Sequence, residues 1–243
     1  MRVFLRSLLL CFFYISLSAF SRVDLGEREP LTHQFFDVLI QQSHEMDNSF
    51  LVLKVVSTQV IFYAPENFLN YVKDNFSEFS DPLTRQPISD MGIYRIPVGT
   101  EEVQFSREET DRFFEILLAT IQEKRDNQIL PKDIEIIRYI VRTGEQFPMA
   151  RARACILSAQ IYRDGRGGVA RNRCAAKIYA ERARCYCIQA GLEYPETVDF
   201  WVLIMAEQLA RELSESLVDS GVSQKLIGKS QQGSYREFER LVR

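Results

Sequence analysis

The feature that most constrains the fold is a helix-turn-helix pattern in residues 154–183, where small, aromatic and glycine residues recur in a fixed register. A helix through Tyr162 is followed by a glycine-rich turn at residues 163–172 and by a second helix from Arg173 onward. Small alanines let two helices approach closely, and glycines allow the positive φ of a sharp reversal. The sequence therefore predicts a helix pair here, with Tyr162 and Tyr179 filling its gap.

This register resembles the SEL-like repeat, a relative of the tetratricopeptide repeat. Gly168 is an additional turn residue, and Asn172 stands where the family has Asp. A single repeat cannot bury its apolar face alone, so the flanking helices must act as divergent repeats or caps. The resemblance implies an all-helical module over residues 105–220 that holds a protein partner and carries no chemistry. The matching residues are Leu157, Tyr162, Gly165, Gly167, Val169, Ala176 and Ala183.

The N-terminal half has a different character, with strand signals before any long helix. Residues 50–63 are dense in β-branched and aromatic residues and are split by two polar residues, which predicts a β-hairpin. Pro65 then stands at the first position of a short helix. Residues 79–98 carry three prolines and no helical period, so we expect an ordered loop or a sheet edge. The fold class is therefore α+β, with a mixed module at about residues 25–100.

Three further helices are predicted beyond residue 105. Ser106 with Glu109 three residues later forms a capping-box pattern ahead of an apolar stripe. Residues 131–144 have Pro at the start and Gly at the end, as a helix prefers. A last helix covers about residues 197–220, with Trp201 expected on its inner side.

A short phrase of an acid followed by Pro-Leu-Thr occurs twice, at Glu29 and at Asp81. Such loops are stiffened by proline, which lowers the entropy cost of holding them ready for a partner. Together with the hairpin and helix between them, the phrases resemble the U-box, the zinc-free relative of the RING domain found in ubiquitin ligases. No cysteine lies between residues 12 and 154, which excludes the zinc sites of a RING.

The U-box resemblance implies specific roles for residues in the two phrases. Leu31, Pro82 and Leu83 match positions that contact a ubiquitin-conjugating enzyme, and Arg85 matches an arginine that holds the conjugated ubiquitin in its reactive pose. Catalysis would act by positioning, since the module offers no nucleophile and needs no metal or cofactor. The resemblance predicts a ubiquitin ligase whose protein substrate is held by the helical repeats. The alternative is a secreted or periplasmic repeat scaffold with no catalytic activity.

The apolar run at the start of the chain predicts the location of the protein. Residues 1–21 have a basic start, an apolar run and small residues, the layout of a cleaved secretory signal. An uncleaved membrane anchor is the alternative, because a membrane helix needs about 20 residues. A bacterial-type leader before two modules typical of eukaryotes indicates a secreted effector that acts in a host cell. The alternatives are a periplasmic or a membrane-anchored protein. At the other end of the chain, residues 221–243 are expected to form a tail with few apolar side chains to bury.

The composition excludes several classes of function. The formal net charge of −3 gives no basic excess for nucleic acid, and we expect membrane contact only through residues 1–21. Residues 151–184 carry eight Arg and one Lys against one Asp and one Glu, a local +7 that indicates a solvated helix face or a surface for an acidic partner. His33 and His44 are the only histidines, and neither lies in a catalytic motif.

Four cysteines lie in or beside the repeat, and their state depends on the compartment. Cys185 and Cys187 are too close together for a zinc knuckle. We expect buried thiols in a reducing compartment and one or two disulfides in an oxidising one. The four residues are Cys155, Cys174, Cys185 and Cys187.

Overall fold

A computed structural model of the chain contains, within its described residues, a small four-stranded antiparallel sheet and six helices. The α+β class predicted from the sequence is therefore confirmed. The chain divides into two compact units, and the division falls inside helix α4 (Arg107–Gln122), between Phe113 and Phe114. The predicted leader and tail lie outside the described residues. The described residues are 29–32, 49–74, 79–97, 103–124, 128–142, 146–193 and 199–219.

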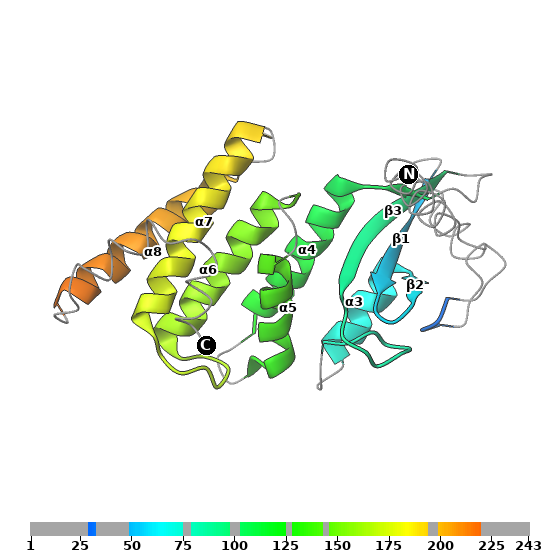
Figure 1. Ribbon diagram of the computed structural model, residues 1–243, viewed down its shortest axis with the longest axis horizontal. Helices are drawn as coiled ribbons and strands as arrows, with labels where there is room; N and C mark the ends of the chain where they lie inside the picture. The colour runs from blue at the N-terminus through cyan, green and yellow to red at the C-terminus, as the bar shows by residue number, and fades with distance from the viewer. Residues whose placement is uncertain are drawn as a thin grey trace, which may run out of the picture. The chain divides into compact units, whose positions relative to one another are not determined.

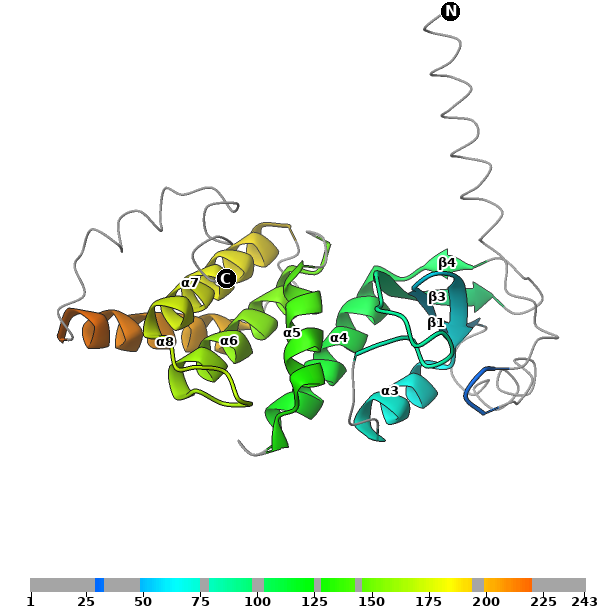
Figure 2. The same ribbon diagram turned by 60° about the horizontal axis from the view of Figure 1, so that its bottom comes forward.

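Unit 1 is built on a sheet with strand order β2-β1-β3-β4, whose strands are labelled in Figures 1 and 2 taken together. The predicted hairpin is confirmed as β1 (Ser49–Val56) and β2 (Val60–Tyr63). The expectation of a loop or an edge across residues 79–98 was wrong for β3 (Asp90–Pro97), which lies inside the sheet between β1 and β4 (Gln104–Phe105).

The strand character of β3 was hidden by Pro87, three residues before it, and by Pro97, its last residue. β3 pairs with β1 over eight residue pairs, from Ser49↔Pro97 to Val56↔Asp90. Its consecutive residues Met91, Gly92 and Ile93 are all buried, so the strand lacks the simple alternation that marks a half-exposed strand.

Helix α3 (Pro65–Asp74) packs beside β1 and supplies an aromatic centre for unit 1 (Figures 1 and 2). The Phe68 side chain is fully buried. Its ring centroid lies 5.6 Å from that of Tyr63 in β2 and 6.4 Å from that of Phe113 in α4. The helix predicted after Pro65 therefore contributes to the core through Phe68.

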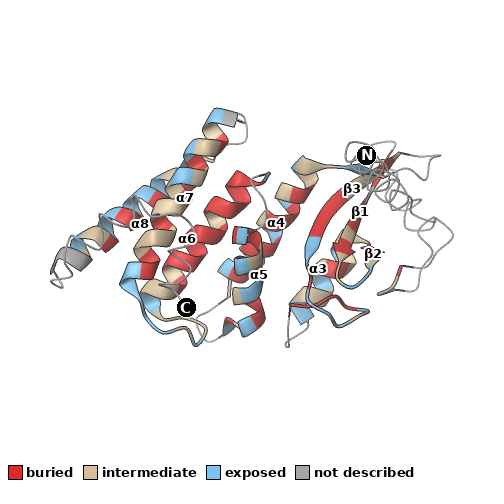
Figure 3. Ribbon diagram, in the orientation of Figure 1, coloured by how far each residue is buried: buried red, intermediate tan, exposed pale blue. Residues whose placement is uncertain are grey.

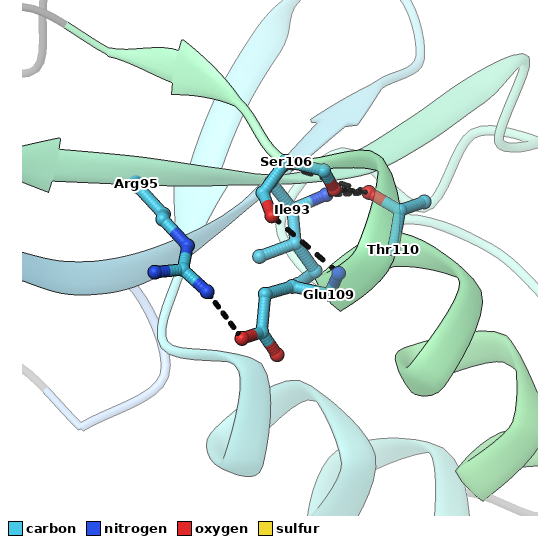
Figure 4. Close-up of polar contacts among 5 residues, drawn as sticks. All are labelled: Ile93, Arg95, Ser106, Glu109 and Thr110. Atoms are coloured by element: carbon cyan, nitrogen blue, oxygen red, sulfur yellow. Dashed lines mark hydrogen bonds and ion pairs between the residues drawn. The ribbon is translucent and has the colours of Figure 1, made fainter. Parts of the chain in front are cut away.

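The start of α4 is tied to β3, as Figure 4 shows. The backbone N–H of Glu109 donates to Ser106 Oγ at 3.4 Å, as the capping pattern predicts. The reciprocal bond of a capping box is replaced, because the Ser106 N–H donates to the Ile93 carbonyl at 2.9 Å. The Glu109 carboxylate instead binds Arg95 at 2.7 Å, and the Ile93 N–H donates to Thr110 Oγ1 at 2.8 Å.

Unit 2 is helical in its described part, with each helix from α5 to α8 contacting the next (Figure 1). The predicted helix pair is confirmed as α6 and α7, with the rings of Tyr162 and Tyr179 stacked 5.6 Å apart at 8°. None of the described helices is long and apolar enough to span a membrane. The helices are α5 (Pro131–Arg142), α6 (Pro148–Asp164), α7 (Arg173–Glu193) and α8 (Phe200–Asp219).

The inner face of α8 differs from the prediction. Trp201, expected inside, is 73% exposed. The buried stripe instead contains alanine, because α8 packs closely on the alanine-rich surface of α6 and α7, where Ala159, Ala176 and Ala180 form one cluster with it. Counting large apolar residues alone therefore misplaced Trp201 and Ile204 in the first turns, whereas Leu209 and Leu213, expected on the same inner side, are buried. The buried residues of α8 are Val202, Ala206, Leu209, Ala210 and Leu213.

Candidate protein-docking site

The first acid-proline phrase folds into a turn around its own carboxylate. Glu29 is fully buried, and its Oε2 accepts hydrogen bonds from the N–H groups of Leu31 at 3.0 Å and Thr32 at 2.7 Å. The Thr32 hydroxyl donates to the same oxygen at 2.8 Å. One buried carboxylate oxygen therefore holds the backbone of this turn.

The second phrase repeats this arrangement 52 residues later, as the positions of Glu29 and Asp81 show. Asp81 Oδ1 accepts from the N–H groups of Leu83 at 2.9 Å and Thr84 at 3.4 Å. In both turns the acceptor is the acid before the proline, and the donors lie two and three residues after it. Such local side-chain bonds to the backbone stabilise turns.

Two further donors connect Asp81 to the hairpin. The Tyr63 hydroxyl donates to Oδ1 at 2.7 Å, and the Ser57 hydroxyl donates to Oδ2 at 2.7 Å. Burial opposes ionisation of Asp81, but the bonds from Ser57, Tyr63 and the backbone outweigh burial and lower its pKa. Burial also raises the pKa of Tyr63, and the charges of Asp81 and Glu29 raise it further. Both turns therefore lie within electrostatic range of one buried hydroxyl.

The three residues predicted to contact a conjugating enzyme differ in their exposure. Leu83 is 58% exposed at the tip of its turn. Leu31 is half-buried, and Pro82 is buried beneath the second turn. Leu83 is therefore the apolar group most available to a partner, whereas Pro82 shapes the turn from inside.

Arg85 lies directly after this turn and has an unusual backbone. Its φ is +58°, the left-handed region, and its N–H donates to the Asp81 carbonyl at 2.9 Å. The exposed guanidinium donates to the Tyr71 hydroxyl at 2.6 Å and lies 5.8 Å from the centroid of that ring. The predicted ubiquitin-positioning arginine is therefore held along helix α3 in this structure.

The glycine-rich turn of unit 2 is organised by its backbone. Gly165 ends α6 at φ +73°, and its N–H donates to the Ile161 carbonyl at 2.8 Å. Gly167 has φ +62°, and a Cβ there would lie 2.7 Å from Ile129 Cγ2. Two of the three predicted turn residues are thus required to be glycine by backbone geometry, and Gly167 also by packing.

The rest of this turn leads into α7. Val169 is half-buried, and its N–H donates to the Arg166 carbonyl at 3.1 Å. Asn172 caps α7 by accepting the Ala175 N–H at 3.0 Å through Oδ1, a role that Asp also fills at helix N-termini.

Most arginines of the run that carries the local charge of +7 make polar contacts inside unit 2. Five of the eight arginines bind carboxylates, a tyrosine hydroxyl or carbonyl oxygens of that unit. A structural role is therefore assigned to most of the run, which leaves less of it for an acidic partner. These arginines are Arg151, Arg153, Arg163, Arg166 and Arg184.

Two of the four described thiols are buried and two are exposed. All four described cysteines are free. Burial raises the pKa of Cys155 to about 12 and that of Cys187 to about 11, so both stay protonated at neutral pH. Cys174 and Cys185 are exposed on α7. The described residues also contain no group of three or more His, Cys, Asp or Glu that could hold a metal ion.

Sequence reasoning missed Ser57 and Tyr63, which hold the second turn in place. Their spacing from Asp81, 24 and 18 residues, gives no local signal. The available signal was the acid at the first position of both phrases, since a buried acid needs several donors.

No family model matches the chain, and no match to it was found among curated proteins or solved structures.

Proposed function

We propose that unit 1 is a U-box-like docking module for a ubiquitin-conjugating enzyme, and that the helices of unit 2 hold a protein substrate. The observation that carries the proposal is the pair of acid-Pro-Leu-Thr turns, each organised by one buried carboxylate. A RING domain fixes its docking loops with zinc. Here hydrogen bonds to Glu29 and Asp81 hold both loops.

The order of elements in unit 1 supports the proposal. A hairpin, a short helix and the second acid-proline turn follow one another, as the U-box resemblance implies. Leu83 projects from the second turn as an exposed apolar side chain on a rigid support. A pre-organised apolar anchor of this kind loses little conformational freedom when a partner binds.

The module would act by positioning the thioester of the bound conjugating enzyme, which supplies the reacting atoms. Arg85 donates to Tyr71 through Nη1 in the structure, so this donor must leave Tyr71 if it is to contact ubiquitin. Because the bond is exposed, its release costs little. Tyr71 thus holds Arg85 close to the turn at which ubiquitin is proposed to bind.

The proposed setting is a host cell reached by secretion, because a ubiquitin ligase needs ubiquitin and the periplasm contains none. The alternative function is a scaffold with no ubiquitin-ligase activity. The observation that favours this alternative is the helix pair α6–α7, a binding architecture that needs no chemistry.

The two functions are separated by reconstitution. The full chain, kept in mild detergent because residues 3–20 are apolar, is mixed with ATP, activating enzyme, a panel of conjugating enzymes and labelled ubiquitin. We expect ubiquitin chains with at least one conjugating enzyme. Absence of chains with every member of the panel overturns the ligase proposal and leaves the scaffold.

Variants connect the activity to the site. Leu83→Arg should lower chain formation at least tenfold, because it removes the exposed anchor. Ile116→Arg is the matched control, since Ile116 is another exposed aliphatic side chain and lies in α4. Arg85→Ala should slow chain formation while the conjugating enzyme still binds, which a purely structural role would not produce. Equal activity of Leu83→Arg and Ile116→Arg contradicts the proposed docking site.

A further inference from the structure

The large apolar side chains that the structure leaves exposed gather on two neighbouring helices. Of the nine such residues among the described residues, six lie at the end of α7 and the start of α8. Leu192 and Trp201 are the most exposed, at 81% and 73%. We call this set the α7–α8 apolar end, and it consists of Ile188, Leu192, Phe200, Trp201, Ile204 and Met205.

The spacing of these residues places them on one face of each helix. Ile188 and Leu192 are four apart in α7, and the α8 residues at 200, 201, 204 and 205 repeat with a period of four. The two helices contact each other. Burial raises the pKa of Cys187, and the charge of Asp199, directly before α8, raises it further, so the start of α8 lies within electrostatic range of the last turns of α7. Figure 3 shows exposed residues on both helices.

We propose that two copies of this chain associate through the α7–α8 apolar end as a two-fold symmetric dimer. The first argument concerns helical arrays. Each helix of such an array is covered by the next, and the outer face of a capping helix is polar. α8 is the last helix that the described residues contain. The outer face of α8 is polar only after its second turn, where Glu207, Gln208, Arg211 and Glu212 are exposed. Its first two turns therefore need a cover.

The second argument concerns area. The six side chains expose apolar surface on the order of 600 Å², at or above the largest patch of a typical monomer. A stable interface buries about 800 Å² on each partner, including a polar rim. The apolar end together with the adjoining polar turn of α8 therefore matches one side of a standard interface.

The third argument concerns charge. The patch itself contains no charged residue. The acids beside it have basic partners: Asp199 binds Arg153 at 2.8 Å, and Glu212 lies 3.8 Å from Arg163. Glu207 and Arg211 offset each other on α8, and Glu181 is bound to Arg184 at 3.2 Å on α7. A strongly basic or acidic partner gains nothing from such a rim. In the dimer the apolar end of one copy contacts the apolar end of the other, and this contact brings no like charges together.

The chain contains natural reporters for this interface. Trp201 is its only tryptophan, so its fluorescence reports on the patch alone. Cys185 is exposed three residues before Ile188 and seven before Leu192, which places it at the edge of the same face. Cys174 is exposed on the same helix eleven residues earlier, about 16 Å along its axis.

The experiment uses the full chain with Cys11→Ser, in mild detergent, over a range of protein concentrations. We expect Trp201 emission to shift to shorter wavelength as the dimer forms, with the same midpoint in analytical ultracentrifugation. A short bismaleimide should then cross-link the dimer, and Cys185→Ser should abolish the cross-linked band, whereas Cys174→Ser should retain it.

Two variants complete the test. Trp201→Glu should lower the dimer fraction at least tenfold with unchanged helix content, because the side chain is exposed in the monomer. Leu83→Arg should leave the dimer intact, so loss of the dimer and loss of the proposed ligase activity are separable. A chain that is monomeric at every concentration overturns the proposal, as does a dimer that survives Trp201→Glu. A monomer whose Trp201 becomes exposed when residues 221–243 are deleted overturns it in favour of the tail as the cover.

Discussion

The second acid-proline turn of unit 1 and the glycine-rich turn of unit 2 are stabilised in different ways. In unit 1 the acid-proline turn depends on one buried side chain, Asp81, which accepts four hydrogen bonds. In unit 2 the glycine-rich turn depends on backbone conformation and close approach, with Gly165, Gly167 and Gly168 all at positive φ. A turn of the first kind responds to protonation and to removal of its donors, whereas a turn of the second kind responds only to added volume or backbone strain.

The largest difference between the two turns is expected when Asp81 is replaced. Asp81→Ala should destabilise unit 1 by about 3–5 kcal/mol, because it leaves the buried hydroxyl of Tyr63 and several other donors without their acceptor. Urea unfolding followed by circular dichroism measures the loss. Asp90→Ala, at an exposed acid in the same unit, is the control and should change stability by less than about 0.5 kcal/mol. Similar effects of the two variants contradict the assigned role of Asp81.

In unit 2 the corresponding change is Gly167→Ala. The new Cβ meets Ile129 Cγ2 at 2.7 Å and the backbone is at φ +62°, so we expect a loss of about 2–3 kcal/mol. Gly168→Ala is the matched control, because its φ of +75° imposes the same backbone strain while its Cβ meets nothing within 4 Å. Its expected cost is about 1 kcal/mol. Equal midpoints in urea contradict a packing role for Gly167.

A smaller effect is expected from one donor of the Asp81 network. Ser57→Ala removes the 2.7 Å bond to Asp81 Oδ2 and should cost about 1 kcal/mol. Thr58→Ala changes the next residue, which is exposed, and should be close to neutral. If thermal unfolding places both variants at the wild-type midpoint, Ser57 does not support the turn.

The smallest effect is expected in the pH dependence of stability, which should differ between the two turns. The folded pKa of Asp81 lies below its unfolded value of about 3.9, so its contribution is complete well above that pH and is lost as the pH falls through the folded pKa. Asp81→Asn should therefore flatten the acid-side decline in the stability of unit 1. Gly168→Ala changes no titratable group, so it should leave that decline unchanged. An unaltered decline in Asp81→Asn contradicts the assignment.

The sequence predicted elements whose signals are local. The hairpin, the helix after Pro65 and the α6–α7 pair each carry their pattern within a few turns of chain, and all three are present. The prediction failed where tertiary packing, rather than the local sequence, determines which residues are buried. Consecutive buried residues and flanking prolines concealed β3, and alanines took the buried positions of α8 that Trp201 was expected to share.

The candidate site was predictable only in part. The turn residues were found because each phrase carries its own acid, proline and threonine. The hydrogen bonds of Asp81 to Ser57 and Tyr63 were not, since they join positions that only the folded hairpin brings together. The burial of Pro82 and the contact of Arg85 with Tyr71 likewise depend on how α3 and the loop meet.

The link between α4 and β3 also bears on how this protein avoids aggregation. Exposed strand edges recruit strands from other molecules. Along the outer edge of β3, β4 occupies Tyr94 and Arg95, and the Ser106 N–H and Thr110 hydroxyl oxygen occupy the carbonyl and N–H of Ile93. Thr110 thus fills the hydrogen-bonding place of a neighbouring strand at Ile93, and Thr110→Val, which removes the hydroxyl, is expected to open this stretch of β3 to pairing with other molecules.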